Sequence, residues 1–161
     1  MTSTPVLAGL GGLYERHYEA VFRAALRVTG SPADAEDVLQ TVFLRVLSRS
    51  EQDEAAGRPA AYFRRAAVNA AVDLLRRRAV HAETAYDDGA SHAAVEPALL
   101  LKEQLRRAIA TLDRDDATLF LLRHVEGLSN QELADAFQIE KNNVAVRLHR
   151  IRLRLQAEME R

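Results

Sequence analysis

The chain has 161 residues, 48% of them hydrophobic and 28% charged, which is enough apolar content for one medium domain or two small ones. Its formal net charge of −1 gives no indication of a nucleic-acid partner, and the absence of cysteine excludes disulfides and thiolate metal sites and fits a reducing cytosol. The N-terminus lacks the pattern of a signal peptide and no stretch is long enough for a membrane-spanning helix, so we expect a cytoplasmic protein without membrane insertion.

The first two predicted helices have clear start and stop signals. Residues 1–12 are small and contain glycine, so we expect a flexible tail there. Helical periodicity begins at Tyr14, and Gly30 is placed to end the first helix. Ser31 and Pro32 then provide an N-cap and a proline at the first helical position, which predicts a second helix directly after the first.

A polar stretch and a basic helix follow. Residues 49–58 are polar and acidic and lead into a Gly-Arg-Pro sequence, which predicts a loop. A third helix, rich in alanine and arginine, is predicted over about residues 59–78. Residues 81–97 show no period and contain an Asp-Asp-Gly sequence, so we expect a flexible linker.

The second half of the chain is also predicted to be helical. Periodicity resumes near Ala98, and Asp113 is placed as the N-cap of a further helix that Gly127 closes. No stretch shows the alternation of a strand, and the four prolines fall in loops or at helix starts.

A helix-turn-helix pattern lies near the end of the chain. Ser129 and Glu132 fit a capping box at the start of a short helix, and a tight turn follows at residues 138–140. The next helix has apolar residues on one side only: Val144, Leu148, Ile151 and Leu155. Two short helices of which the second is basic on its open side are typical of a helix-turn-helix. The fold class predicted is therefore all-α, with two small helical bundles joined by a flexible linker and the helix-turn-helix in the second.

Positive charge gathers in two segments. Residues 58–78 contain six arginines and one aspartate, and residues 141–155 contain one lysine and four arginines with no acidic residue. Residues 81–97, between them, contain four acidic residues and neither lysine nor arginine. Two basic segments around an acidic one indicate two separate contacts with a polyanion.

The second helix of the helix-turn-helix has the chemistry to read DNA. Its first turns carry Lys141, Asn142, Asn143 and Val146. A helix fits the major groove, where asparagine pairs with adenine, lysine with guanine and an apolar side chain with the thymine methyl group. Arg150 lies further along and is placed to meet phosphates. The alternative is an amphipathic helix whose arginines merely face water.

Three ordered stretches resemble one known family. Residues 31–45 resemble the region of sigma factors that docks on the clamp helices of RNA polymerase. Residues 58–78 look like the helix that melts and reads the promoter −10 element, and residues 122–150 are similar to the −35-reading domain. The chain thus resembles an extracytoplasmic-function sigma factor of the sigma-70 family over roughly residues 14–155.

The resemblance implies a division of the chain and a set of partners. It implies a sigma region 2 domain at 13–80 and a sigma region 4 domain at 98–161, on either side of the linker. The partners implied are core RNA polymerase, promoter DNA and an anti-sigma factor. It implies no cofactor and no metal, and the five scattered histidines and the lack of catalytic motifs predict that the chain is not an enzyme.

The resemblance also assigns roles to residues of this chain. The residues expected to bind polymerase are Glu36, Asp37, Gln40 and Phe43. Those expected to bind the −10 DNA are Arg58, Tyr62, Arg64, Arg65, Asn69, Arg76 and Arg77. Those expected to bind the −35 DNA are Lys141, Asn142, Asn143, Val146, Arg147 and Arg150.

Several of these residues have a structural alternative. Phe43 and Tyr62 suit a domain core as well as an interface. Within residues 51–58, which match the family loop that captures an extruded base, Gln52 or Asp53 is the candidate for hydrogen bonding to that base.

Departures from the family pattern keep rival functions open. Thr41 stands where an acidic residue is common, and Ala145 and Val146 replace commonly polar residues of the reading helix. They leave open a sigma mimic or degenerate relative that binds an anti-sigma protein without starting transcription. A simple helix-turn-helix repressor is the third interpretation. Gln138 replaces the frequent turn glycine, so the turn must avoid a positive φ or carry strain.

Overall fold

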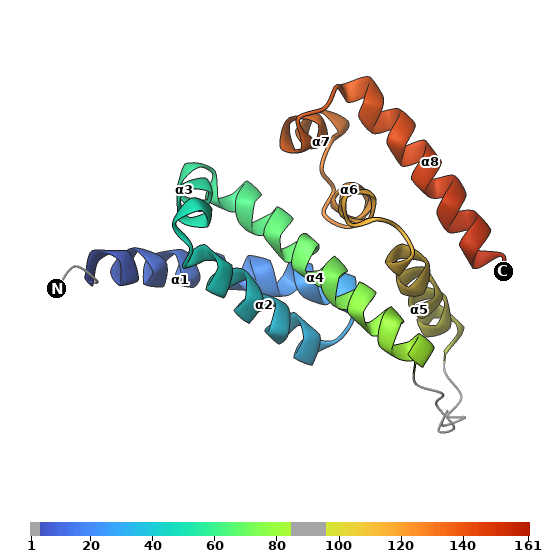
Figure 1. The fold of residues 1–161 in the computed structure, drawn as a ribbon, viewed down its shortest axis with the longest axis horizontal. Coiled ribbons are helices and arrows are strands. Elements are labelled where there is room, and N and C mark those ends of the chain that lie inside the picture. The colour runs from blue at the N-terminus through green and yellow to red at the C-terminus, as the bar shows by residue number, and fades with distance from the viewer. Residues whose placement is uncertain (1–3, 85–95) are drawn as a thin grey trace. The chain divides into compact units, whose positions relative to one another are not determined.

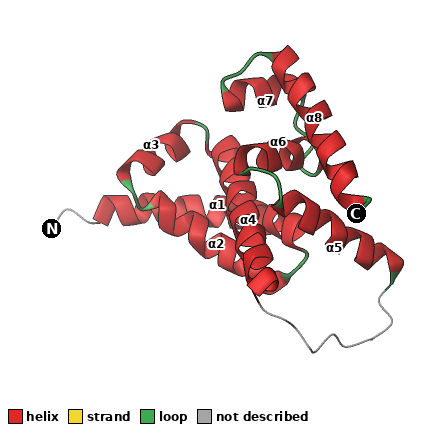
Figure 2. Cartoon of the chain, turned by 45° about the vertical axis from the view of Figure 1, so that its right-hand side comes forward, coloured by secondary structure: helices red, strands yellow, loops and turns green. Residues whose placement is uncertain are grey.

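A computed structural model describes residues 4–84 and 96–161, and within these ranges every regular element is an α-helix (Figures 1 and 2). The helices are α1 (Thr4–Thr29), α2 (Pro32–Val46), α3 (Arg49–Gly57), α4 (Pro59–Thr84), α5 (Pro97–Ala110), α6 (Arg114–His124), α7 (Asn130–Phe137) and α8 (Lys141–Met159). The chain divides into two compact units, with the boundary after Ala71 inside α4. The predicted all-α fold in two parts is confirmed.

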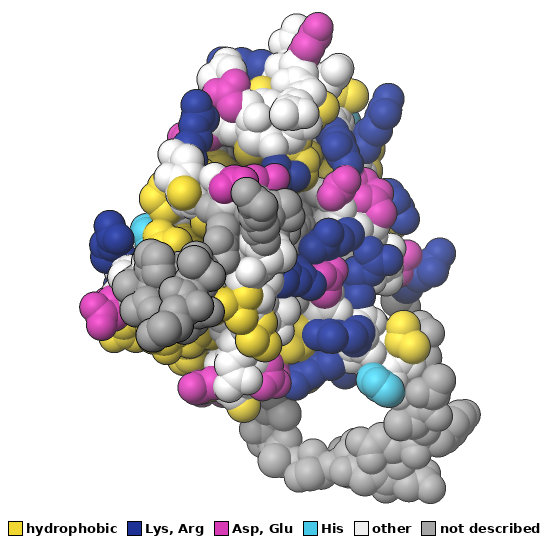
Figure 3. Space-filling view, turned by 60° about the vertical axis from the view of Figure 1, so that its left-hand side comes forward, with side chains coloured by type: hydrophobic (Ala, Val, Ile, Leu, Met, Phe, Trp, Pro, Cys, Tyr) yellow, Lys and Arg dark blue, Asp and Glu magenta, His cyan; other side chains and the backbone are white. Residues whose placement is uncertain are grey.

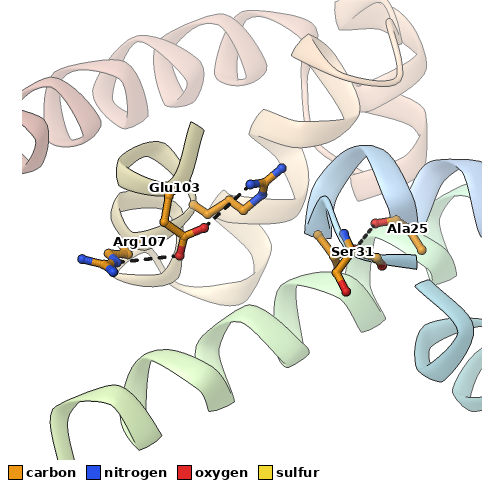
Figure 4. A network of polar contacts seen from close by, with 6 residues as sticks. Ala25, Ser31, Glu103 and Arg107 are labelled. Carbon is orange, nitrogen blue, oxygen red and sulfur yellow. Dashed lines mark hydrogen bonds and ion pairs between the residues drawn. The ribbon is translucent and has the colours of Figure 1, made fainter. Parts of the chain in front are cut away.

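In the first unit, α1 and α2 form a helical hairpin. Gly30 ends α1 with a φ of 68°, and Ser31 caps α2 by accepting a hydrogen bond from the backbone N–H of Asp34 (3.4 Å). The Thr29 hydroxyl donates to the carbonyl of Ala25 (2.9 Å), and its oxygen accepts from the backbone N–H of Ser31 (3.4 Å) (Figure 4). This short turn confirms the predicted helix boundary and brings the apolar stripes of the two helices together.

The core of the first unit is made of small and branched side chains around one large aromatic. The fully buried hydrophobic residues include Val21, Ala25, Val38, Val42, Val46 and Phe63. Phe63, from α4, is 1% exposed and stacks on Phe43 of α2, with the ring centroids 5.1 Å apart. Burial of such side chains at about 25 cal/mol per Å² of apolar surface is the main force that closes the unit.

Two helices are longer than the sequence predicted, and a third replaces a predicted loop. Helix α1 begins at Thr4, so the tail predicted over residues 1–12 is wrong for its described part. Residues 49–57 form α3 instead of a loop, because their Ala, Glu and Gln are good helix formers and Ala55 is fully buried. Helix α4 continues to Thr84 and takes in the first residues of the predicted linker, whereas residues 85–95 of that linker lie outside the described residues.

In the second unit, α8 packs against α5, α6 and α7. Its predicted apolar stripe is buried throughout: Val144, Leu148, Ile151 and Leu155 are 0–4% exposed. The predicted core of the helix-turn-helix is therefore confirmed.

Along α5, Glu103 forms ion pairs with Arg106 (3.7 Å) and Arg107 (3.7 Å) (Figure 4).

Two helix starts of the second unit, those of α6 and α7, are capped as predicted. Asp113 accepts a hydrogen bond from the backbone N–H of Asp116 (2.9 Å) at the start of α6. Ser129 and Glu132 form the capping box of α7, with both reciprocal hydrogen bonds present (3.1 and 3.4 Å). Each cap satisfies backbone N–H groups that would otherwise lack a partner within the helix.

The turn of the helix-turn-helix carries backbone strain. Gln138 adopts a left-handed conformation with φ 55° and ψ 45°, and the following N–H, of Ile139, reaches the carbonyl of Ala134 (3.0 Å). A side chain with a Cβ is disfavoured in this conformation by about 1 kcal/mol or more relative to glycine. The turn therefore tolerates the strain rather than avoiding the positive φ.

Gln138→Gly is expected to raise the free energy of unfolding of the second unit by about 1 kcal/mol, because glycine adopts φ 55° without the Cβ penalty. Gln104→Gly, on the exposed side of α5, is the matched control and should lower it by about 1 kcal/mol. Chemical denaturation of the two variants measures both changes. A decrease for Gln138→Gly would contradict the assignment of strain to this turn.

Candidate functional site

The outer face of α2 carries the predicted polymerase-binding residues. The helix buries Ala35, Val38 and Val42, so the positions between them face outward. Glu36, Asp37 and Gln40 occupy such positions, and all three polar side chains are exposed. The structure brings these predicted residues together on one face at the capped start of α2.

An apolar groove lies beside this polar face. Its volume is about 610 Å³, and its lining consists of Gly11, Tyr14, Glu36, Leu39, Gln40, Phe43, Leu44 and Leu47. Leu44 is 65% exposed and Leu47 is 51% exposed, which is unusual for leucines of a packed helix. The groove thus combines an apolar floor with a carboxylate and an amide at its edge, and Leu44, Leu47, Gly11 and Tyr14 are members that the sequence analysis did not assign.

Phe43 belongs both to the groove and to the core. Its ring meets Tyr14 edge-on (centroids 4.9 Å apart) and stacks on the buried Phe63 (5.1 Å). Tyr14 in turn stacks on Tyr18 (5.4 Å). Phe43 therefore contacts the core through its stacking on Phe63 and is also half-buried at the groove.

On α4, the predicted −10 residues fall on more than one side. Tyr62, Arg65, Asn69 and Arg76 recur at helical spacing and share one face. Arg64 lies two residues after Tyr62, about 200° around the helix, and is exposed on a different side of α4. Figure 3 shows lysine and arginine side chains at several places on the face it presents, with acidic side chains among them.

The remaining −10 residues differ in their surroundings. Tyr62 is half-buried and packs its ring edge-on against Phe63 (5.2 Å), so it too has a packing role. Arg58 and Arg77 are exposed. The candidates for base capture, Gln52 and Asp53, lie within α3 rather than in a loop, and Asp53 is exposed.

The first turns of α8 present the predicted −35 residues to solvent. Lys141, Asn142 and Asn143 are exposed, and Val146 is 50% exposed. Asn143, Val146 and Arg150 also line a hollow of about 380 Å³ that reaches Asp113 and Asp116 at the start of α6. The reading side of the helix therefore has an acidic neighbour that the sequence analysis did not consider.

Arg147 is held by that neighbour. Its Nε donates to Oδ1 of Asp116, forming an ion pair in which the side chains are 33% and 16% exposed. The pair joins α8 to α6 across 31 residues of sequence. Arg147 thus links two helices while it lines the same hollow as Asn143, Val146 and Arg150. No local sequence pattern marks Asp116 as its partner.

The same corner holds a carboxyl group of altered acidity. The backbone N–H of Asp116 lowers the pKa of Asp113, and the charge of Arg147 lowers it further. The lowered pKa keeps Asp113 ionised, and so able to cap α6, to a lower pH than an ordinary aspartate.

Two histidines have lowered pKa values. His17 stacks on Phe63 (4.8 Å), and burial together with the nearby charge of Arg16 lowers its pKa from 6.5. Burial and the charges of Arg152 and Arg123 lower the pKa of His124, whose ring lies against Phe120 (4.5 Å). Both rings favour the neutral form in the folded chain.

The described residues contain no cluster of three or more His, Asp or Glu side chains able to hold a metal ion. None of the helices in the described ranges is long and apolar enough to cross a membrane.

Comparison with known proteins finds one family in both units. Residues 13–80 match the model of Sigma-70 region 2, and residues 102–155 match that of Sigma-70, region 4. The chain is 31% identical over 148 residues to the RNA polymerase sigma-E factor of Streptomyces coelicolor, an alignment that covers 88% of this chain and 80% of that protein.

A second relative is longer than this chain. The ECF RNA polymerase sigma factor SigE of Mycolicibacterium smegmatis is 30% identical over 151 residues, which cover 89% of this chain and 58% of that protein. The chain therefore spans less than two thirds of this relative's length.

A solved structure shares the fold. It is the sigma factor RpoE in complex with the anti-sigma factor NepR from Bartonella quintana, with a TM-score of 0.51, 16% sequence identity and coverage of 91% of this chain and 94% of that one. At this level of identity the likeness concerns the fold alone.

Substitution of Arg147 and of Arg150 should have different effects. Arg147→Ala removes the ion pair with Asp116 and should lower the free energy of unfolding by about 1 kcal/mol, a value reduced by the partial exposure of the pair. Arg150→Ala should leave stability within about 0.5 kcal/mol and weaken duplex DNA binding across sequences, lowering its salt dependence by about one phosphate contact. Denaturation and salt titrations of DNA binding give the two readouts. An unchanged stability in Arg147→Ala would contradict its role as a link.

His17 makes the stability of the first unit depend on pH. Because its folded-state pKa lies below 6.5, its contribution is present in full above that pH and is lost as the pH falls below it. His17→Phe keeps the ring contact with Phe63 and cannot titrate. The loss of stability between about pH 7.5 and about pH 5.5 should therefore be smaller in this variant than in the wild type, as measured by denaturation. His149→Phe, an exposed position, is the control, and equal losses in all three proteins would disprove the role of His17.

Proposed function

The chain belongs to the sigma-70 family, in its extracytoplasmic-function group, and we propose that it binds core RNA polymerase and directs promoter-specific initiation by reading −10 and −35 elements. The observation that carries this function is the order of regions 2 and 4 along one chain, with an exposed docking face in the first unit and a helix-turn-helix in the second. Its role is that of a transcription regulator. We propose that it catalyses no reaction itself and acts in the cytoplasm, where bacterial polymerase and promoter DNA meet.

Polymerase docking uses α2 and the adjoining groove. Glu36 and Asp37 offer two carboxylates, and Gln40 an amide, to a basic and polar partner surface. Beside them, Leu44 and Leu47 leave apolar area uncovered. An apolar centre edged by polar groups is the arrangement of a stable protein interface, in which the buried apolar residues contribute most of the affinity.

The shared face of α4 would meet the melted −10 strand. Tyr62 offers a partly exposed ring for base stacking, which tolerates any base. Arg65 and Arg76 on the same face offer charge to the phosphates, and Asn69 offers an amide to a base edge. Arg58, Arg64 and Arg77 are exposed around it and add to the electrostatic attraction.

The start of α8 would enter the major groove at the −35 element. Lys141, Asn142 and Asn143 can pair with base edges there, and Val146 can meet a thymine methyl group. Arg150 supplies a phosphate contact. Arg147 acts indirectly in this proposal, since its ion pair with Asp116 fixes α8 on α6 and so orients the reading residues.

The domain division proposed is residues 13–80 for docking and the −10 element, and residues 98–161 for the −35 element. An anti-sigma factor that covers one or both faces is the regulatory partner proposed, and the solved relative carries such a protein. Thr41 was one reason to consider a sigma mimic, because an acidic residue is common at its position. Its side chain is half-buried on α2, so an acid there would add less exposed charge than the sequence implied.

Charge reversal on α2 should separate docking from folding. The double variant Glu36→Lys/Asp37→Lys is expected to weaken binding to purified core polymerase by about tenfold or more, because two carboxylates at the interface are reversed. Glu54→Lys, exposed on α3, is the control and should change affinity by less than about twofold. Fluorescence anisotropy of the labelled chain measures the affinities, and thermal unfolding checks that both variants fold.

Run-off transcription on a genomic promoter library tests the function as a whole. Core polymerase with this chain should start at defined new sites, and the −10 and −35 sequences can be read from those sites. Failure to bind core would reject the proposal in favour of the sigma mimic, and tight specific binding to duplex DNA without polymerase would favour a repressor.

A further inference from the structure

The N-terminal part of α1 reaches the apolar groove beside α2 through one residue. The helix begins at Thr4, whereas the match to Sigma-70 region 2 begins at residue 13. Gly11, from this earlier part, lines the groove together with Tyr14. The opposite wall is α2, with Gln40 at the edge of the groove. One residue outside the matched region therefore contributes to the surface proposed to bind polymerase.

The segment before residue 13 contains three glycines within four positions. Gly9, Gly11 and Gly12 lie inside α1, and the positive-φ glycines of the described chain are others, Gly30 and Gly127. A Cβ at Gly9 or Gly11 would have no atom within 4 Å. At Gly12 it would meet the flexible end of the Arg16 side chain at 3.3 Å. Neither backbone conformation nor packing therefore requires glycine at these positions.

The three glycines lower the stability of this part of helix α1. Glycine is the weakest helix former after proline, because it loses the most backbone freedom on ordering. The first turn of α1 also has no acidic side chain to favour the helix dipole. Further along the helix, Val21 and Ala25 are fully buried and anchor it in the core. The first turns of α1 are therefore joined to its anchored part by a short stretch whose helical state is weakened by glycine.

We propose that residues 4–12 are a marginally stable helix that reaches the groove at Gly11 and that core polymerase stabilises this helix when it docks, so that the glycines of the segment lower the affinity for polymerase. The inference rests on the proposed function. Polymerase is the occupant because the groove is continuous with the polar face of α2: Glu36, Gln40 and Phe43 line the groove and belong to the predicted docking set. Exposed Leu44 and Leu47 leave apolar area for it to cover.

The physical consequence is that the affinity for polymerase is lower than the contacts of the fully formed surface would give. A binding surface that is only partly formed in the free chain gives an apparent affinity lowered by the fraction that is formed. Stabilising the formed state without adding contacts removes that loss. Weaker docking allows other partners of the same face to compete with polymerase. The addition of one methyl group, by a glycine-to-alanine substitution, should change the affinity for polymerase.

Gly9→Ala tests the inference most directly, because Gly9 lies in the segment but does not line the groove. The variant should raise the helical signal of the free chain in far-UV circular dichroism and tighten binding to core polymerase by roughly two- to fivefold. Gly9→Pro should act in the opposite direction, since proline breaks the helix before the groove. Gly57→Ala, at the end of α3 and also free of neighbours, should add helix without changing affinity.

The outcomes separate this inference from the proposed function. No polymerase binding by the wild type would reject both. Binding by the wild type with equal affinity in Gly9→Ala and Gly9→Pro would reject the inference alone, as would weaker binding by Gly9→Ala, which would mean that the segment must unfold for docking. An increase in affinity from Gly57→Ala equal to that from Gly9→Ala would also overturn it, because the effect would then be one of general stability.

Discussion

The apolar stripe of each long helix determines which of its residues a partner can reach. In α8, Val144, Leu148, Ile151 and Leu155 occupy one side at spacings of three and four, and all four are buried. Their burial leaves Lys141, Asn142, Asn143 and Val146 on the outside of the first turns. Without this stripe the same residues would have no fixed direction, so the reading surface is a product of core packing in the second unit.

The first unit depends on the same principle, with an aromatic side chain at its centre. Phe63 is buried and touches His17 on α1, Phe43 on α2 and Tyr62 on its own helix. Two of these neighbours, Phe43 and Tyr62, were predicted to bind polymerase and DNA respectively. Residues proposed to meet two different partners thus share one core contact. A change at Phe63 would therefore affect both functions together and could not be assigned to either.

Local signals predicted much of this fold, and tertiary context explains what they missed. The caps at Ser31, Asp113 and Ser129 were read correctly because a cap depends only on residues three positions apart. The helical state of residues 49–57 was missed because their polarity resembles that of a loop, and only the burial of Ala55 distinguishes them. The ion pair of Arg147 with Asp116 was missed because it spans 31 residues, which no periodicity reveals. Periodicity correctly indicated which side of α8 is buried, but it does not bring the residues named on α4 to one face, because Arg64 departs from the face of Tyr62.

The near-zero net charge of the chain hides two surfaces of opposite sign. The docking face on α2 is acidic, while α4 and α8 carry most of their charge as arginine and lysine. A polymerase surface that attracts Glu36 and Asp37 must be basic, and the same surface would repel the arginines of α4 and α8. DNA has the reverse preference, because its phosphates attract the basic helices and repel α2. Charge separation along the chain would therefore match each surface to the partner proposed for it and disfavour the exchange of partners, a selectivity that the summed charge of −1 cannot express.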